Sequence, residues 1–115
     1  MKTNSAFWEE MTHLLATHRL VIDRPQGQPH PSYPEAIYPF DYGYLENTIS
    51  GDGSGIDVWL GSLGTKKLTG ILCTFDTLKQ DAEIKLLLGC DENDLKIIRE
   101  FHGERMKILY IPKEH

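Results

Sequence analysis

The chain has 115 residues, of which 40% are apolar and 25% are charged, which fits one domain with a buried core. Its net charge of −5 argues against a nucleic-acid surface and implies that an anionic ligand needs metal ions or a local basic cluster. No apolar run approaches the roughly 20 residues that span a bilayer, and the start lacks the apolar core of a signal peptide. Cys73 and Cys90 fit neither a disulfide framework nor a zinc spacing. We therefore expect one cytoplasmic domain over residues 1–115, with free thiols and with no membrane or nucleic-acid partner.

The first part of the chain predicts one helix, one strand and one long loop. Residues 5–17, within an N-terminal segment 1–18, carry apolar side chains at helical spacing. We expect Ser5 to cap this helix and its apolar face to dock on the domain or on a second subunit. A short strand is expected over residues 19–23. Residues 24–39 hold all but one of the six prolines, which predicts an extended loop that wraps the body of the domain.

The second part predicts five strands and a second helix. The expected strands cover residues 42–46, 56–61, 68–75, 82–90 and 106–112. The third of these is almost continuously apolar, as expected for a strand that is covered on both faces or curled in a barrel. The fourth alternates, so that Glu83 and Lys85 share one face. Asp91 is expected to cap a helix that runs to about His102 and ends at Gly103. These elements together predict an α+β fold, a small, partly open β-barrel with helical attachments.

Four aspartates stand at the ends of the predicted strands, and the two in each turn are five residues apart. They are Asp52, Asp57, Asp76 and Asp81. If both turns open at the same rim, four carboxylates converge, which is costly unless a cation binds. Mg²⁺ is the usual hard cation beside a phosphate, whereas the calcium-loop pattern of alternating ligands is absent. Aspartates that cap the backbone of their own turns explain either pair taken alone. Both interpretations, a structural turn and a metal site, remain open on the residues alone.

A family resemblance is carried by residues 38–58, YPFDYGYLENTISGDGSGIDV. This segment resembles the soluble, magnesium-dependent inorganic pyrophosphatases that have an OB-fold-like barrel. The family has the pattern Y-P-x-x-Y-G-[FY], followed by D-x-D-x-x-D. The segment aligns with both patterns without a gap, and only the middle aspartate is missing. A second family pattern, D-x-x-x-x-D-x-K, is similar to residues 76–83. The similarity covers about residues 38–86, and the chain is shorter than is usual in that family.

The resemblance implies an assignment of site residues and of a cofactor. Asp57 and Tyr42 match catalytic positions, and Tyr42 also lines the phosphate pocket of the family. Arg19 stands in the place of a lysine that contacts phosphate. Lys85 matches no family position, and we expect it to contact the substrate because strand alternation puts it on the same face as Glu83. The cofactor is Mg²⁺, with Mn²⁺ as a substitute. The implied metal ligands are Asp52, Asp57, Asp76 and Asp81.

The departures from the family pattern leave two functions open. Ser54 stands where the family has the aspartate that orients or deprotonates the attacking water, and Glu83 stands where it has a phosphate-binding lysine. We find no counterpart to the family's pocket arginine. Lys85 shares the face of Glu83 and could partly replace the lysine, while Glu83 could add a metal ligand.

The expected function is metal-dependent hydrolysis of pyrophosphate or a related phosphoanhydride. The alternative is a non-catalytic barrel that binds a metal–phosphate ligand or a protein partner. Because members of the family commonly associate, a homo-oligomer is also compatible with the resemblance, and the face with Phe7, Trp8 and Met11 could form its contact.

Overall fold

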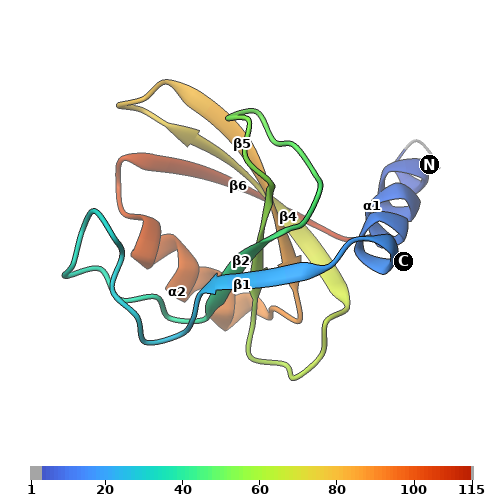
Figure 1. Ribbon diagram of the computed structural model, residues 1–115, viewed down its shortest axis with the longest axis horizontal. Helices are drawn as coiled ribbons and strands as arrows, with labels where there is room; N and C mark the ends of the chain where they lie inside the picture. The colour runs from blue at the N-terminus through green and yellow to red at the C-terminus, as the bar shows by residue number, and fades with distance from the viewer. Residues whose placement is uncertain (1–3, 115) are drawn as a thin grey trace.

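A computed structural model describes residues 4–114 of the chain, which form two helices and six strands (Figure 1). In chain order they are α1 (Ser5–Thr17), β1 (Leu20–Arg24), β2 (Asp41–Leu45), β3 (Ile56–Leu60), β4 (Leu68–Asp76), β5 (Asp81–Leu88), α2 (Glu92–His102) and β6 (Met106–Pro112). Every element predicted from the sequence is present, and no strand end is displaced by more than two residues. The first three residues of the expected segment 1–18, and His115, lie outside the described residues.

The six strands form one mixed, open sheet in the order β1-β2-β3-β5-β4-β6. All neighbouring strands are antiparallel except β3 and β5, which are parallel. The fold is therefore α+β, as predicted, with one helix at the N-terminal end and one near the C-terminal end. The expected barrel is not shown, because β1 and β6 form the two free edges of the described sheet. No helix within residues 4–114 is long and apolar enough to cross a membrane.

Both faces of the sheet are covered at its centre, which explains the nearly continuous apolar strands. Successive residues of a strand point to opposite faces. One core cluster contains Val58, Ile71 and Leu86 and packs against α1. The next residue of each strand belongs to a second cluster that packs against α2. The sheet thus separates an α1 face from an α2 face, and a strand that is buried on both faces needs apolar residues at every position.

Helix α1 docks on the domain mainly through Trp8, whose exposed fraction is 4%. The expected Ser5 cap is wrong, because the N-cap position is Asn4, and the Asn4 side chain makes no capping hydrogen bond. Instead, Asn4 Nδ2 donates to Glu114 Oε2 at 2.9 Å, which joins the two ends of the described chain. Figure 1 shows the end of the chain that follows β6 beside α1. The predicted docking of an apolar helical face on the domain is confirmed.

Helix α2 begins with the predicted cap and with a second contact that the sequence did not reveal. Asp91 accepts a hydrogen bond from the Asp94 amide, and the Asp94 side chain accepts one from the Asp91 amide, which completes a capping box. Asp94 is 2% exposed and also accepts bonds from the amide and the hydroxyl of Ser62. At the other end Gly103 has φ of +76°, a conformation that favours glycine. The predicted helix bounds are therefore correct.

The proline-rich loop folds back on itself rather than wrapping the sheet. Pro29 and Ile37 form an isolated antiparallel bridge, and Gly27 and Gln28 exchange backbone hydrogen bonds with Tyr38. Most of the loop is exposed, whereas Tyr38 is 3% exposed and belongs to the core on the α2 face. Figure 1 shows the loop projecting beside α2. Tyr38 thus anchors the loop next to the end of the sheet that carries the site.

Candidate functional site

A cavity of about 880 Å³ lies on the α2 face of the sheet, beside the core on that face. Strands β2, β3, β4 and β5 supply its floor, the proline-rich loop supplies one wall, and the end of α2 with the start of β6 supplies another. Its charged lining residues are Asp23, Arg24, Asp52, Asp57, Asp76, Lys79, Asp81, Glu83, Lys85 and Arg105. The cavity therefore gathers six carboxyl groups and four cationic groups.

The loop before β3 holds Asp52 at the rim of the cavity. Asp52 Oδ1 accepts hydrogen bonds from Ser50 Oγ at 2.6 Å and from the Ser54 amide at 2.9 Å. Gly53, between them, has φ of +86°, which the tight turn requires. The Ser50 hydroxyl, a hydrogen bond to Glu83 and the Ser54 amide lower the pKa of Asp52 to about 2. The Asp52 carboxyl is therefore ionised at neutral pH.

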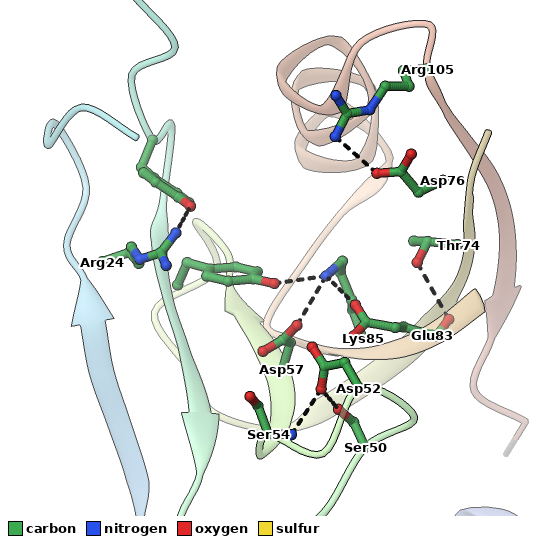
Figure 2. Close-up of polar contacts among 12 residues, drawn as sticks. Arg24, Ser50, Asp52, Ser54, Asp57, Thr74, Asp76, Glu83, Lys85 and Arg105 are labelled. Carbon is green, nitrogen blue, oxygen red and sulfur yellow. Dashed lines mark hydrogen bonds and ion pairs between the residues drawn. The ribbon is translucent and has the colours of Figure 1, made fainter. Parts of the chain in front are cut away.

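The floor of the cavity carries a buried ammonium group between carboxylates (Figure 2). Lys85, whose side chain is 5% exposed, places Nζ 3.0 Å from Asp57 Oδ2 and 3.5 Å from Glu83 Oε1. It also donates to the Tyr42 hydroxyl at 2.7 Å. Burial and the neighbouring Asp57 carboxylate raise the pKa of Tyr42 above its usual value. This arrangement follows from the register, because Asp57 pairs with Lys85 across the parallel strands β3 and β5.

The carboxyl groups of Glu83 and Asp52 are hydrogen-bonded to each other near Lys85. Burial, followed by hydrogen bonding to Asp52, raises the pKa of Glu83 to about 7. One proton is thus shared between the two carboxyl groups at or below neutral pH, because like charges at short range do not both ionise. A cation placed between them would replace that proton. Among the features of the cavity, this pair offers the strongest physical reason for binding a positive charge.

Asp76 occupies the opposite side of the cavity and is 3% exposed. Its Oδ1 accepts from the amides of Leu78 and Lys79, and its Oδ2 accepts from Arg105 Nη2 at 3.0 Å. These hydrogen bonds hold the pKa of Asp76 below its usual value, with the Lys79 amide as the largest cause. Asp76 therefore closes its own turn and orients Arg105 toward the cavity. Ligation of a metal by Asp76 would require Arg105 to move away.

Aromatic and cationic groups form the walls of the cavity. Arg24 Nη1 donates to the Tyr38 hydroxyl at 2.6 Å, and the His30 ring stacks on Tyr38 with an interplanar angle of 7°. Arg105 Nη1 donates to the Tyr33 hydroxyl at 3.1 Å, which connects the proline-rich loop to the start of β6. In Figure 2, Arg24 and Arg105 lie on opposite sides of the group around Lys85. The walls thus combine positive charge with flat rings.

One further wall residue is a buried histidine at the end of α2. His102 Nε2 is buried without a hydrogen-bond partner among the described residues. Burial, and then the positive charges of Lys85 and His30, lower the pKa of His102 to about 3. The His102 ring is therefore neutral at all pH values at which the protein is expected to work.

The structure brings most of the residues predicted from the sequence together and leaves one outside. Tyr42, Lys85 and the four aspartates all border the cavity. Arg19 does not, because its guanidinium pairs with Glu46 at 2.9 Å on the surface and its side chain is 72% exposed. The role of Arg19 as a phosphate contact thus has no support from its position.

Two arginines of the cavity were missed in the sequence. Arg105 directly precedes β6, and that strand pairs with β4 so that Met106 lies opposite Asp76. Only the antiparallel β4–β6 pairing, which no motif indicates, brings Arg105 to the cavity. Arg24 ends β1, one residue beyond the predicted strand, and an irregularity in the β1–β2 register precedes it. The one available signal was the position of each arginine at the end of a predicted strand.

The donor chemistry of the cavity fits Mg²⁺ or Mn²⁺, because hard cations prefer carboxylate oxygens. The ligands of such a metal site are not already grouped. Within residues 4–114 the structure has no cluster of at least three His, Cys, Asp or Glu side chains that could hold a metal ion. Asp57 is engaged by Lys85, and Asp76 by Arg105. Metal binding therefore requires side-chain rearrangement. We expect Asp52, Asp57, Asp81 and Glu83 to be the ligands, with Lys85 giving up its contacts to Asp57 and Glu83.

The fold and the site define an α+β protein with a highly charged cavity on one face of an open mixed sheet. Comparisons of the chain with protein-family models, with curated proteins and with solved structures found no match. The function must therefore be argued from the cavity itself.

Proposed function

We propose that the chain hydrolyses pyrophosphate or a related phosphoanhydride in a reaction that depends on Mg²⁺ or Mn²⁺. The observation that carries the proposal is the gathering of six carboxyl and four cationic groups around one cavity. A phosphoanhydride with its metal ions has the complementary distribution of charge. Neither the carboxylates alone nor the cations alone would favour that ligand.

The metal would be held by Asp52, Asp57, Asp81 and Glu83. When bound, it supplies neutralisation of phosphate charge and a bound water of lowered pKa. This assignment departs from the resemblance in one respect, because Glu83 joins the ligands and Asp76 instead holds Arg105. The shared proton of Glu83 and Asp52 supports the change, since a cation relieves their repulsion.

The chain's own cations would bind and orient the phosphate groups. Lys85 is buried beneath the cavity with its ammonium group next to Asp57 and Tyr42. Arg24 and Lys79 border the cavity from the proline-rich loop side and from the β4–β5 turn. An ammonium held by a tyrosine hydroxyl and a carboxylate is oriented before the ligand arrives, which reduces the entropy lost on binding.

The cavity contains no obvious general base at the position implied by the resemblance. Ser54 borders the cavity, but its hydroxyl has no basic partner within residues 4–114, and its amide donates to Asp52 in the turn. A positioned base contributes about 10²–10⁴-fold in rate, so we propose a slow enzyme. The second candidate function, binding of a metal–phosphate ligand without turnover, is favoured by this same observation.

The fold proposal accompanies the functional one. We propose that the sheet is a shortened version of an OB-fold-like barrel. The strand order β1-β2-β3-β5-β4 and the parallel β3–β5 pair support it. In this chain β6 occupies the second edge of β4, the edge through which a five-stranded barrel would close on itself.

Phosphate release from pyrophosphate tests the proposal. Wild type should release phosphate in the presence of Mg²⁺ or Mn²⁺, and this release should stop when EDTA is added. Asp57→Asn should lose most of that rate, because it removes a central carboxylate and the partner of Lys85. Glu46→Gln is the matched control, since it alters an exposed carboxylate outside the cavity. Arg19→Met should also retain the rate, in contrast to the assignment that the resemblance implies.

A wild-type protein without metal-dependent turnover would eliminate the hydrolase. Calorimetric titration with Mg²⁺ and imidodiphosphate, a pyrophosphate analogue that resists hydrolysis, then separates the two candidates. Binding that Asp57→Asn abolishes would support the non-catalytic function. An absence of heat with both ligands would reject both functions.

A further inference from the structure

The cavity is larger than pyrophosphate requires. Its volume of about 880 Å³ is near the upper end of the roughly 300–1,000 Å³ range that holds drug-sized ligands. The carboxylates and Lys85 that would hold a metal-bound phosphate occupy only the floor formed by β3 and β5 and the adjoining loop. The remaining space lies between the proline-rich loop and the end of α2.

The chemistry of that remaining space differs from that of the floor. Its walls carry the rings of His30, Tyr33, Tyr38 and Phe101. The Tyr33 side of this wall is open, because Tyr33 is 45% exposed although it borders the cavity. The ring of His30 lies 5.1 Å from that of Tyr33 and stacks on the buried Tyr38 ring. The wall is therefore a row of flat rings whose outermost member, Tyr33, is partly exposed.

Charged groups connect this aromatic wall to the phosphate end. Arg24 binds the hydroxyl of Tyr38, and Arg105 binds both the hydroxyl of Tyr33 and the carboxylate of Asp76. Arg105 also lies over the Tyr33 ring, with Cζ 5.7 Å from the ring centroid. A ligand that reaches from the floor to the wall would thus pass cationic groups before it meets a ring. Such a ligand is a chain of phosphates that ends in an aromatic group.

We propose that the cavity takes a nucleoside di- or triphosphate in preference to inorganic pyrophosphate. The phosphates would lie on the floor with the metal, and the base would stack on Tyr33 next to His30. This inference rests on the proposed function and specifies its substrate. Hydrolysis of a triphosphate would form a bond between a water oxygen and the terminal phosphorus and break the bond from that phosphorus to the bridging oxygen. The bridging oxygen leaves on the nucleoside diphosphate, and the remaining proton of the reaction passes to solvent.

Equilibrium binding by the full chain in the presence of Mg²⁺ tests the inference. The ligands are the non-hydrolysable imido analogue of adenosine triphosphate, imidodiphosphate, and inorganic triphosphate, which has the longer phosphate chain but no ring. Wild type should bind the nucleotide analogue at least about five-fold more tightly than either ring-free ligand, which is the low end of base stacking on an aromatic side chain. Equal or weaker binding of the nucleotide analogue would overturn the inference.

Two variants of Tyr33 separate the ring from its hydroxyl. Tyr33→Ala should weaken binding of the nucleotide analogue by about five- to a hundredfold while leaving the affinity for imidodiphosphate unchanged. Tyr33→Phe loses the bond to Arg105 but keeps the ring, and it should bind the nucleotide analogue as wild type does. Both variants should fold, because the side chain is on an exposed loop.

The outcomes distinguish the failure of this inference from the failure of the proposed function. Tight binding of imidodiphosphate with no effect of Tyr33→Ala on the nucleotide would reject the base site and keep the phosphate site. A Tyr33→Ala variant that weakens all three ligands equally would also reject the base site. No binding of any of the three would reject both.

Discussion

The buried ammonium of Lys85 makes a specific prediction about stability. Lys85→Met keeps most of the side-chain volume but removes the positive charge between Asp57 and Glu83. Both carboxyl groups are largely buried, with exposed side-chain fractions of 23% and 15%. The variant therefore leaves two carboxyl groups next to each other with no cationic partner at that position. The Tyr42 hydroxyl loses its donor as well.

Removal of one partner of a buried ion pair costs about 3–5 kcal/mol of unfolding free energy. We expect about 3 kcal/mol at about pH 8, the low end of that range, because water still reaches part of Asp57. The cost should fall by about 1 kcal/mol at about pH 6. There the native protein carries a protonated Glu83, whose pKa is raised to about 7, and the repulsion of Asp57 is reduced.

Urea unfolding followed by tryptophan fluorescence measures these differences, since Trp8 and Trp59 are both buried. Lys79→Met is the matched control, because Lys79 borders the same cavity but is exposed, and it should stay within about 0.5 kcal/mol of wild type. If the carboxylates bind Mg²⁺, the metal at ten times its Kd should stabilise Lys85→Met by about 1.4 kcal/mol. A cost of Lys85→Met below about 0.5 kcal/mol at both pH values would refute the reasoning. Loss of a buried ammonium group that pairs with two carboxylates should lower the unfolding free energy by more than that.

Three further predictions concern other parts of the molecule. His102 has a native pKa of about 3, below its unfolded value of about 6.5, so its contribution to stability is present above about pH 6.5 and is lost as the pH falls. The unfolding free energy of wild type and of His102→Leu is measured between about pH 6.5 and pH 3. Over this range wild type should lose about 2–4 kcal/mol more than the variant. If the two free energies fall in parallel with pH, the burial of a neutral His102 ring is contradicted. Asp94→Ala should cost about 2–4 kcal/mol in urea unfolding, because it leaves amides of Asp91 and Ser62 without their acceptor, whereas Asp94→Asn should keep part of that stability. Ser54→Asp should raise pyrophosphate turnover by about 10²-fold if the side chain faces the attacking water, and an unchanged or lower rate would count against the alignment with the pyrophosphatases.

The fold was largely predictable from the sequence because its signals are local. Proline content located the loop, apolar periodicity located α1, and the Asp91 cap with Gly103 located both ends of α2. The error at Ser5 arose because the chain offers Asn4, another residue type that favours the N-cap position, just before it. Closure into a barrel could not be decided in the same way, because it depends on which strand pairs with the second edge of β4. Such pairing is non-local and leaves no signal in one sequence.

The site was predictable only in part, for a related reason. The aspartate turns and Tyr42 lie within one continuous stretch of the resemblance, and the structure places them around one cavity. The alternation in β5 correctly placed Glu83 and Lys85 on one face. It did not show that this charged face is the more enclosed one, with Lys85 at 4% exposure and Ile84 at 41%. A pattern of alternation identifies two faces of a strand. Enclosure depends on parts of the chain far away in sequence, here α2 and Tyr38 at the end of the proline-rich loop, which belong to the core on this face.

The balance of charge in the cavity connects its lysine with its proposed metal. Six carboxyl groups face four cations, so the cavity is net negative before any ligand binds, as is the whole chain. A phosphoanhydride is itself an anion, and at close range like charges repel by several kcal/mol in an environment of low dielectric constant. If the proposed function holds, the phosphate should therefore bind only after the cation or together with it, because the cation neutralises the negative charge that would repel an anion. When both bind, Asp57 would exchange Lys85 for the cation, and the Lys85 ammonium group would contact the phosphate instead.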